Sequence, residues 1–205
     1  MQGNIIKIIL DSFTMKEIYK KIWKLAKPYY EKGRPMDIDH IDWIMQEALV
    51  VCEKEKVDDS LLVPLVILHD VGYGETGPAY FEKNLKKLHM EAGEKIARQI
   101  LEKVNYPNDK IEQIASWISV HDNWIFGKTE VYKENKILNI FSDLDFTWMA
   151  SKKGFEYIRK HLKKNPEEMI KYLETAEKHE NIPFCTETTK MIYNDNLSER
   201  KAELA

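Results

Sequence analysis

Apolar residues recur every three or four positions along most of the chain, whereas strict alternation of apolar and polar residues is scarce. This spacing is typical of amphipathic helices that bury one face. We therefore predict an all-α fold, with Asp37 as the N-cap of the second helix. The expected helices cover about 5 or 14–30, 37–52, 61–69, 81 or 85–104, 109–121 and 134–151, followed by amphipathic segments at 155–163, 166–179 and 186–204.

One stretch, from Leu61 to Glu75, stands out because its sequence LLVPLVILHDVGYGE leads a long apolar run into the adjacent pair His69 and Asp70. Periodicity alone does not distinguish a buried strand from a buried helix here. On a helix, neighbouring side chains lie about 100° apart and can reach one ion at the helix end. N-cap chemistry at residues 58–60 also favours a core helix. Residues 71–80, with three glycines, are predicted to form a mobile loop beside the pair.

Further histidines and an aspartate fall on the apolar faces or ends of the neighbouring helices. His40 lies at the edge of one apolar stripe, His89 in the middle of another, and His121 at the end of a third. A helical wheel places Asp145 on the apolar face of its helix and Asp143 on the opposite, solvated side. Each histidine taken alone has a structural alternative as a packed or hydrogen-bonded core residue. An imidazole or carboxylate on an apolar face is costly without a partner, so we expect these groups to meet.

Length, charge and cysteine content limit the expected number of domains, the class of partner and the cellular compartment. A chain of 205 residues suits one domain, and a net charge of −3 gives no basic footprint for nucleic acid. No apolar run is long enough to span a membrane, and the start does not resemble a secretory signal. Cys52 and Cys185 are isolated and expected on helices as reduced thiols, which indicates the cytoplasm. His161 and His179 lie among charges and are expected at the surface.

The proposed cluster consists of imidazoles and carboxylates without cysteine. Such ligands suit Mn, Fe, Co, Ni or Zn, with Mg also admitted, and they argue against a structural zinc site. The residues of the cluster are His40, His69, Asp70, His89, His121 and Asp145.

The ordered series H, HD, H, H, D on successive helices resembles the HD-domain superfamily of metal-dependent phosphohydrolases. The resemblance covers about 33–151 of a single domain over 1–205. It rests on the motifs DIDHIDW, LVILHDVGYGE, KLHMEAGEKIARQIL, WISVHDNW and KILNIFSDLDFTW. It implies a compact helical bundle with a metal site between the core helices.

The resemblance also implies a ligand set for one or two divalent ions. Metal one would be held by His40, His69, Asp70 and Asp145. Metal two would be held by Asp70, His89 and His121, with Asp70 bridging. For the last ligand of metal one, the wheel favours Asp145 and leaves Asp143 as the other candidate.

The implied activity is hydrolysis of a phosphate ester, on a nucleotide or a small phosphorylated metabolite, by metal-activated water. Asp70 and His69 would be catalytic. Near the predicted rim, Arg34, Lys83, Lys86 and Lys87 are candidates for binding the phosphoryl group, with an ordinary surface charge as the alternative for each.

Two departures and two alternatives bear on this reading. The acidic pair that follows HD in the stringent-nucleotide hydrolases is missing, and no GYP signature of the cyclic-di-nucleotide phosphodiesterases follows the pair. The same ligands would also serve a di-iron HD-type oxygenase acting on a small organic substrate. A non-catalytic nucleotide- or metal-binding module is the third reading. The expected partner is a small molecule, without nucleic acid or membrane, and both a monomer and a homodimer fit the sequence.

Overall fold

Helices make up the regular structure, as the periodicity predicts. The computed structural model describes residues 15–78 and 82–204, and no strand occurs within these ranges. The chain divides into two compact units that meet in sequence between Ile125 and Phe126.

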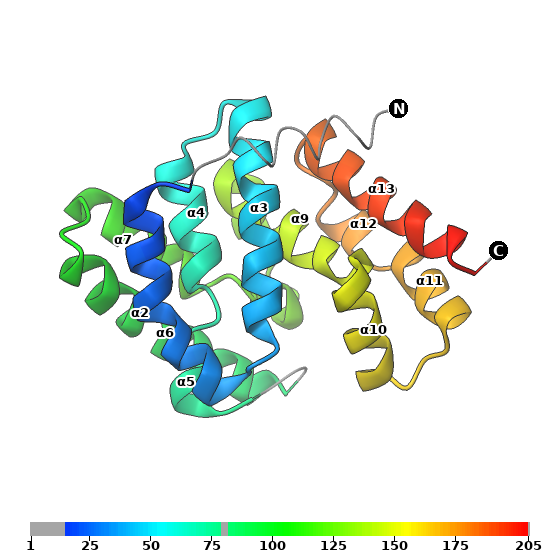
Figure 1. Cartoon of the computed structure of the whole chain (residues 1–205), viewed down its shortest axis with the longest axis horizontal. Coiled ribbons are helices and arrows are strands. Elements are labelled where there is room, and N and C mark those ends of the chain that lie inside the picture. The colour runs from blue at the N-terminus through cyan, green and yellow to red at the C-terminus, as the bar shows by residue number, and fades with distance from the viewer. Residues whose placement is uncertain (1–14, 79–81, 205) are drawn as a thin grey trace. The chain divides into compact units, whose positions relative to one another are not determined.

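The first unit is built around a short apolar helix. Its helices are α2 (Glu17–Gly33), α3 (Asp37–Glu55), α4 (Asp59–Leu68), α5 (Tyr73–Thr76), α6 (Lys83–Lys103) and α7 (Asn108–Ile118). Helix α4 contacts α2, α3 and α7, and Figure 1 shows it beside α2 and α3. All residues from Leu62 to Leu68 are buried. The apolar run therefore forms the centre of this unit and carries the His-Asp pair at its C-terminal end.

Side chains compensate the backbone groups that α4 leaves without helical partners. The Asp58 side chain accepts a hydrogen bond from the Ser60 amide at 2.9 Å, which confirms the predicted capping region. Pro64 has no N–H to donate to the Ser60 carbonyl, and the Tyr106 hydroxyl donates to that carbonyl instead, at 2.7 Å. The proline is therefore accommodated inside the helix, beyond its first turn.

The segment after the His-Asp pair differs from the expected mobile loop. Residues 69–72 form turns, and the chain then enters α5, in which Tyr73 and Gly74 are buried. A Cβ at Gly72 would lie 1.9 Å from the His89 carbonyl oxygen, because the turn packs against the backbone of α6. The prediction missed this close helix contact, and its part at 79–80 lies outside the described residues.

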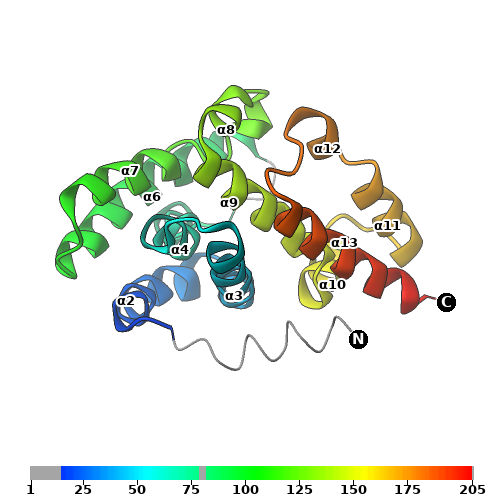
Figure 2. The same ribbon diagram turned by 90° about the horizontal axis from the view of Figure 1, so that it is seen from above.

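The second unit packs short helices around an apolar cluster. It contains α8 (Glu130–Glu134), α9 (Lys136–Thr147), the 3₁₀ turn η2 (Trp148–Ala150), α10 (Lys152–His161), α11 (Pro166–Glu174), α12 (Lys178–Asn181) and α13 (Glu187–Ala202); the 3₁₀ turn η1 (Asn123–Phe126) spans the boundary. Helix α11 contacts both α10 and α13, and Figure 2 shows it beside α13. The cluster consists of Ala150, Phe155, Met169, Leu173, Tyr193 and Leu197.

Asp143 is fully buried in this unit, and the prediction that it is solvated is wrong. Its carboxylate accepts hydrogen bonds from the Lys178 ammonium at 2.6 Å, the Cys185 amide at 2.7 Å and the Thr189 hydroxyl at 2.7 Å. Helix α9 is buried on more than one face, so the wheel chose the wrong side for this residue. Cys185 precedes α13 and does not lie on a helix as expected.

The two histidines expected at the surface differ from each other. His161 is exposed. His179 is half-buried, donates from Nε2 to the Leu173 carbonyl at 2.8 Å and packs edge-on against Phe146. The surface prediction is therefore wrong for His179, which belongs to an aromatic cluster.

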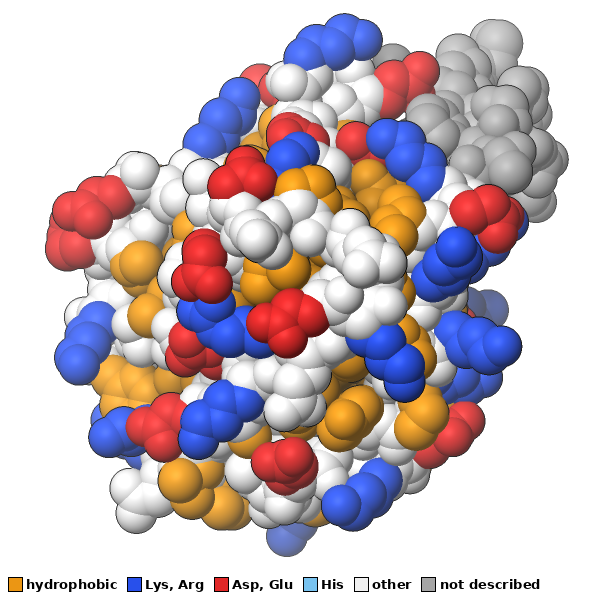
Figure 3. All heavy atoms as spheres, turned by 90° about the vertical axis from the view of Figure 1, so that its left-hand side faces the viewer, with side chains coloured by type: hydrophobic (Ala, Val, Ile, Leu, Met, Phe, Trp, Pro, Cys, Tyr) orange, Lys and Arg blue, Asp and Glu red, His pale blue; other side chains and the backbone are white. Residues whose placement is uncertain are grey.

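Charges of both signs are interspersed on the face shown in Figure 3, and neither gathers into a broad patch there. Each helix of the described residues is too short or too polar to cross a lipid bilayer.

Candidate metal centre

Two imidazoles are held in the tautomer that a metal ligand needs. His69, at the end of α4, and His121, just after α7, each place Nδ1 near the carbonyl three residues earlier, at 2.9 Å and 2.7 Å. A carbonyl can only accept, so both Nδ1 atoms carry the hydrogen and donate it. In the neutral rings, the Nε2 lone pairs are consequently directed into the site.

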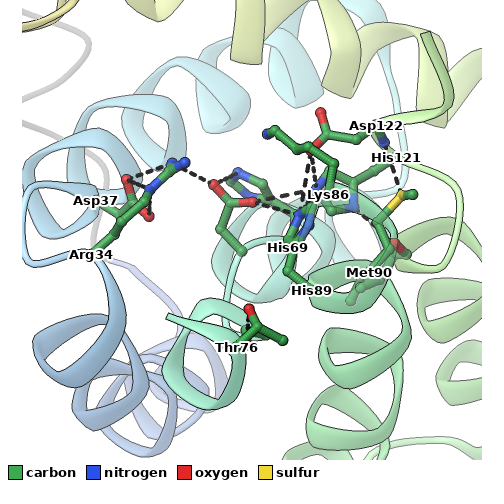
Figure 4. Close-up of polar contacts among 12 residues, drawn as sticks. Arg34, Asp37, His69, Thr76, Lys86, His89, Met90, His121 and Asp122 are labelled. Carbon is green, nitrogen blue, oxygen red and sulfur yellow. Dashed lines mark hydrogen bonds and ion pairs between the residues drawn. The ribbon is translucent and has the colours of Figure 1, made fainter. Parts of the chain in front are cut away.

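Asp70 lies at the centre of the cluster, and its two carboxylate oxygens face different partners. Oδ2 accepts a hydrogen bond from Arg34 Nη2 at 2.9 Å and lies 3.3 Å from His69 Nε2. Oδ1 lies 3.3 Å from both His89 Nε2 and His121 Nε2. Figure 4 shows His69, His89 and His121 converging from separate parts of the chain. This carboxylate therefore joins two neighbouring groups of possible ligands.

Asp122 closes one of these groups. Its Oδ2 lies 2.6 Å from the Lys86 ammonium, 3.3 Å from His89 Nε2 and 3.6 Å from His121 Nε2. Its Oδ1 accepts a hydrogen bond from Trp124 Nε1 at 2.9 Å. Asp70, His89, His121 and Asp122 can each offer one ligand atom so that all four lie within 4.8 Å of one another, and all four residues are buried.

The second group of possible metal ligands around Asp70 includes residues at the start of α3. His40 is buried, and its ring centroid is 5.4 Å from that of His69. Ligand atoms of Asp37, His40 and Asp70 also lie within 4.8 Å of one another. Asp37 was expected to cap the helix, but Met36 is the N-cap, and the Asp37 carboxylate is instead paired with Arg34.

Arg34 links Asp37 and Asp70 and packs against an aromatic ring. Its Nε and Nη2 atoms donate to the Asp37 carboxylate at 2.8 Å each. Its guanidinium carbon is 4.2 Å from the ring centroid of Tyr73, and Tyr73 stacks on His89 with centroids 4.1 Å apart. The Tyr73 hydroxyl is buried and has no hydrogen-bond partner among the described residues.

Electrostatics keep the central carboxylates ionised. Burial alone would raise the pKa of Asp70, but the neighbouring His69 and Arg34 hold it well below its usual value. Burial likewise opposes ionisation of Asp122, yet Lys86 lowers its pKa below the ordinary range. Although burial favours the neutral amine, Asp122 raises the pKa of Lys86. Burial lowers the pKa of His89, which favours the neutral imidazole that a metal requires.

Apart from the Lys86 ammonium, which donates to Asp122 Oδ2 at 2.6 Å, the atoms around Asp70 Oδ1 and Asp122 Oδ2 are richer in acceptors than in donors. His121 Nε2 presents a lone pair, and the two oxygens are negatively charged. His89 Nε2 can direct at most one hydrogen at one of them. Buried acceptors at 3.3 Å from one another are costly unless a cation lies between them. The donor set of imidazole nitrogens and carboxylate oxygens fits a divalent transition metal.

The structure brings five of the six predicted ligands into one cluster of the first unit: His40, His69, Asp70, His89 and His121. The sixth, Asp145, is half-buried on α9 of the second unit, and its role as a ligand stays a prediction.

The four predicted phosphoryl-binding residues divide into two pairs. Arg34 and Lys86 are buried and bonded to the aspartates of the cluster. Lys83 and Lys87 are exposed on α6, and Lys87 lies 3.7 Å from Glu91.

Two acidic residues of the site, Asp37 and Asp122, were missed as possible ligands. A signal existed for Asp122, because His121 and Asp122 repeat the His-Asp pair at the end of another apolar helix. For Asp37, the spacing of three residues from Arg34 across a helix start was the available signal.

A protein-family model described as HD domain matches residues 37–191. The chain belongs to the HD-domain family. The HD-domain match covers most of the chain and extends beyond the predicted motif region at 151 into the second unit. It confirms the resemblance and the all-α fold, and this superfamily consists generally of metal-dependent hydrolases. No curated protein and no solved structure matches the chain.

Proposed function

We propose that this HD-domain protein hydrolyses a phosphate ester of a small molecule, either a nucleotide or a phosphorylated metabolite. The observation that carries the proposal is the buried convergence on Asp70. Its Oδ1 lies 3.3 Å from two imidazole nitrogens, and one of these rings is fixed by a carbonyl in the ligand tautomer. HD-domain membership supports hydrolysis as the reaction that uses such a site.

The residues of the site have two roles: some would bind the metal ion, and Asp70 would also orient the attacking water. Bound divalent metal lowers the pKa of coordinated water towards neutrality and polarises a phosphoryl oxygen. His40, His69 and Asp70 would hold an ion on one side, with Asp145 as the predicted fourth ligand. Asp70, His89 and His121 would hold an ion on the other side. The Asp70 carboxylate would accept a hydrogen bond from the attacking water and so orient it.

Fixed positive charge beside the ligands favours an anionic substrate. Arg34 and Lys86 are both buried, and each lies within 5.5 Å of the Tyr73 ring centroid. Burial raises the pKa of Tyr73, so its phenol stays protonated and offers a hydrogen-bond donor. We infer that this phenol and the two cations bind phosphoryl oxygens as negative charge develops on them. Lys83 and Lys87 would bind the more distant part of the substrate.

The test compares ligand variants with a histidine control. We expect His69→Ala and Asp70→Ala to lose both bound metal and turnover in a panel of phosphomonoesters and phosphodiesters, because each removes a ligand. His161→Ala removes an exposed imidazole and should leave both unchanged. Elemental analysis of protein purified without added metal gives the metal content, and circular dichroism confirms the fold. Normal turnover by either ligand variant at normal metal content would contradict the proposal.

The same preparation distinguishes the alternative activities. Bound iron with substrate-dependent oxygen consumption, and no phosphate release, would indicate a di-iron oxygenase. Ligand binding without turnover of any panel member would indicate a non-catalytic nucleotide- or metal-binding module. Phosphate release that stops on chelation and returns with Mn, Fe, Co, Ni, Zn or Mg supports hydrolysis.

A further inference from the structure

Five of the six separations among four ligand atoms in the first unit are nearly equal. His89 Nε2 is 3.3 Å from His121 Nε2, 3.3 Å from Asp70 Oδ1 and 3.3 Å from Asp122 Oδ2. His121 Nε2 is 3.3 Å from Asp70 Oδ1 and 3.6 Å from Asp122 Oδ2. A regular tetrahedron with metal–ligand bonds of about 2.0–2.1 Å has edges of about 3.3–3.4 Å. These five separations match the edges of such a tetrahedron, and one ligand atom from each of the four residues lies within 4.8 Å of the others, so the group is close to a tetrahedral cage.

We propose that Asp70, His89, His121 and Asp122 form a closed four-ligand site for a tetrahedral divalent ion, zinc or cobalt(II). Asp122 is the added ligand, since the resemblance to the HD superfamily implies only Asp70, His89 and His121 at this position. The proposal rests on the metal-dependent function proposed above. It specifies the coordination number and the class of ion at one of the two positions.

Each ligand of the cage has a partner that fixes its orientation. The Ile118 carbonyl holds His121, Arg34 holds Asp70, and the Tyr73 ring stacks on His89. Lys86 donates to one carboxylate oxygen of Asp122, and Trp124 donates to the other. Figure 4 shows Lys86 beside Asp122. Carboxylate ligands of metals are commonly hydrogen-bonded in this way by a second layer of residues. In this arrangement Lys86 orients Asp122 and offsets part of the negative charge.

A closed site has a consequence for the position beside it. Four protein ligands leave no place for water on a tetrahedral ion, so this position would hold its ion without activating water. Water activation then belongs to the neighbouring position at His40 and His69. Asp70 would connect the two positions, one through each oxygen.

Cobalt(II) gives a readout that does not depend on activity, because tetrahedral cobalt absorbs visible light far more strongly than six-coordinate cobalt. We expect cobalt titrated into the metal-free full-length protein to show the strong tetrahedral bands. Asp122→Asn should lose most of that absorption and bind the ion at least about 10-fold more weakly. Trp124→Phe removes the donor to Oδ1 and keeps an aromatic ring, and it should weaken binding about 10-fold, at the lower end for such outer partners. Asp109→Asn, an exposed carboxylate on α7, is the matched control and should change neither value.

Each result has one meaning. Weak cobalt bands in the wild-type protein, or a spectrum and affinity of Asp122→Asn equal to those of the wild type, would overturn the four-ligand site. If Asp122→Asn does not fold, Trp124→Phe decides, because Trp124 is 40% exposed and the substitution is expected to leave the fold intact. Unchanged cobalt affinity in Trp124→Phe would then count against the proposal. Wild-type protein that binds no metal would instead refute the proposed function, whereas phosphatase activity with an unaffected Asp122→Asn variant would refute only this inference.

Discussion

Gly72 lies where the turn after the His-Asp pair packs on α6, and Gly72→Ala tests how tightly that contact sets the site. A Cβ there would be 1.9 Å from the His89 carbonyl oxygen and 2.7 Å from the Gly93 amide nitrogen. Both are backbone atoms, so no side-chain rotation can relieve the overlap. The backbone dihedral φ of −62° is ordinary for any residue, which leaves steric overlap as the cause of any loss.

The size of the effect follows from the overlap. Ordinary contacts of a Cβ begin at 3.4 Å, so the turn and α6 must separate by about 1.5 Å. Overpacking of this kind costs about 3 kcal/mol when backbone has to move. The same displacement acts on the 3.3 Å separation between Asp70 Oδ1 and His89 Nε2. A shift larger than about 1 Å in such a site is expected to lower turnover at least about 100-fold.

Urea denaturation and metal analysis of the same samples measure both effects. Gly93→Ala is the control on the same helix contact, because its Cβ would be 3.2 Å from Ile118 Cγ2 and 3.4 Å from the His69 carbonyl oxygen. It should change the free energy of unfolding by less than about 1 kcal/mol, since a small packing cost is offset by helix propensity. A Gly72→Ala protein as stable as the wild type, with its metal retained, would refute the reasoning.

Three further predictions concern stability. Burial raises the pKa of Glu47 to about 7 from 4.5, so the folded state binds more protons than the unfolded state between these values and stability falls as pH rises. Relative to the wild type, the free energy of unfolding of Glu47→Gln should therefore be about 3 kcal/mol higher at pH 8 than it is below pH 4.5, as urea titrations at both pH values would show; parallel profiles would contradict this. Tyr106→Phe should lower the free energy of unfolding by about 1–2 kcal/mol, because the Ser60 carbonyl loses its hydrogen-bond donor. An unchanged melting curve would contradict this and show that water replaces the donor. Asp143→Ala should lower the free energy of unfolding by about 3–5 kcal/mol, since it leaves the Lys178 ammonium without its carboxylate partner. Thermal denaturation, compared with the milder Asp143→Asn variant, measures this loss.

The helices and most of the cluster could be predicted because their signals are local. The apolar run before His69 must be buried wherever it lies, and an imidazole on an apolar face requires a partner. The spacing of His89 and His121 on their stripes therefore placed them correctly in the core.

The positions that the sequence did not predict depend on which helix faces are covered after the helices pack. Asp143 looked solvated because one wheel allows one buried face, whereas Lys178 and Thr189 cover the other. Arg34 looked like a rim cation, but its pairing with Asp37 requires the turn between α2 and α3 to fold back on itself. The partners in both cases are fixed by tertiary contacts that periodicity does not encode.

The positively charged side chains within the cluster allow the protein to fold without a bound metal ion. Asp37, Asp70 and Asp122 are three buried carboxylates, and Arg34 and Lys86 supply two countercharges from the chain itself. Repulsion among the acids is thus largely neutralised before any ion arrives. Such a chain can fold before it binds an ion, so the supply of metal would govern when the proposed activity begins and not whether the protein folds.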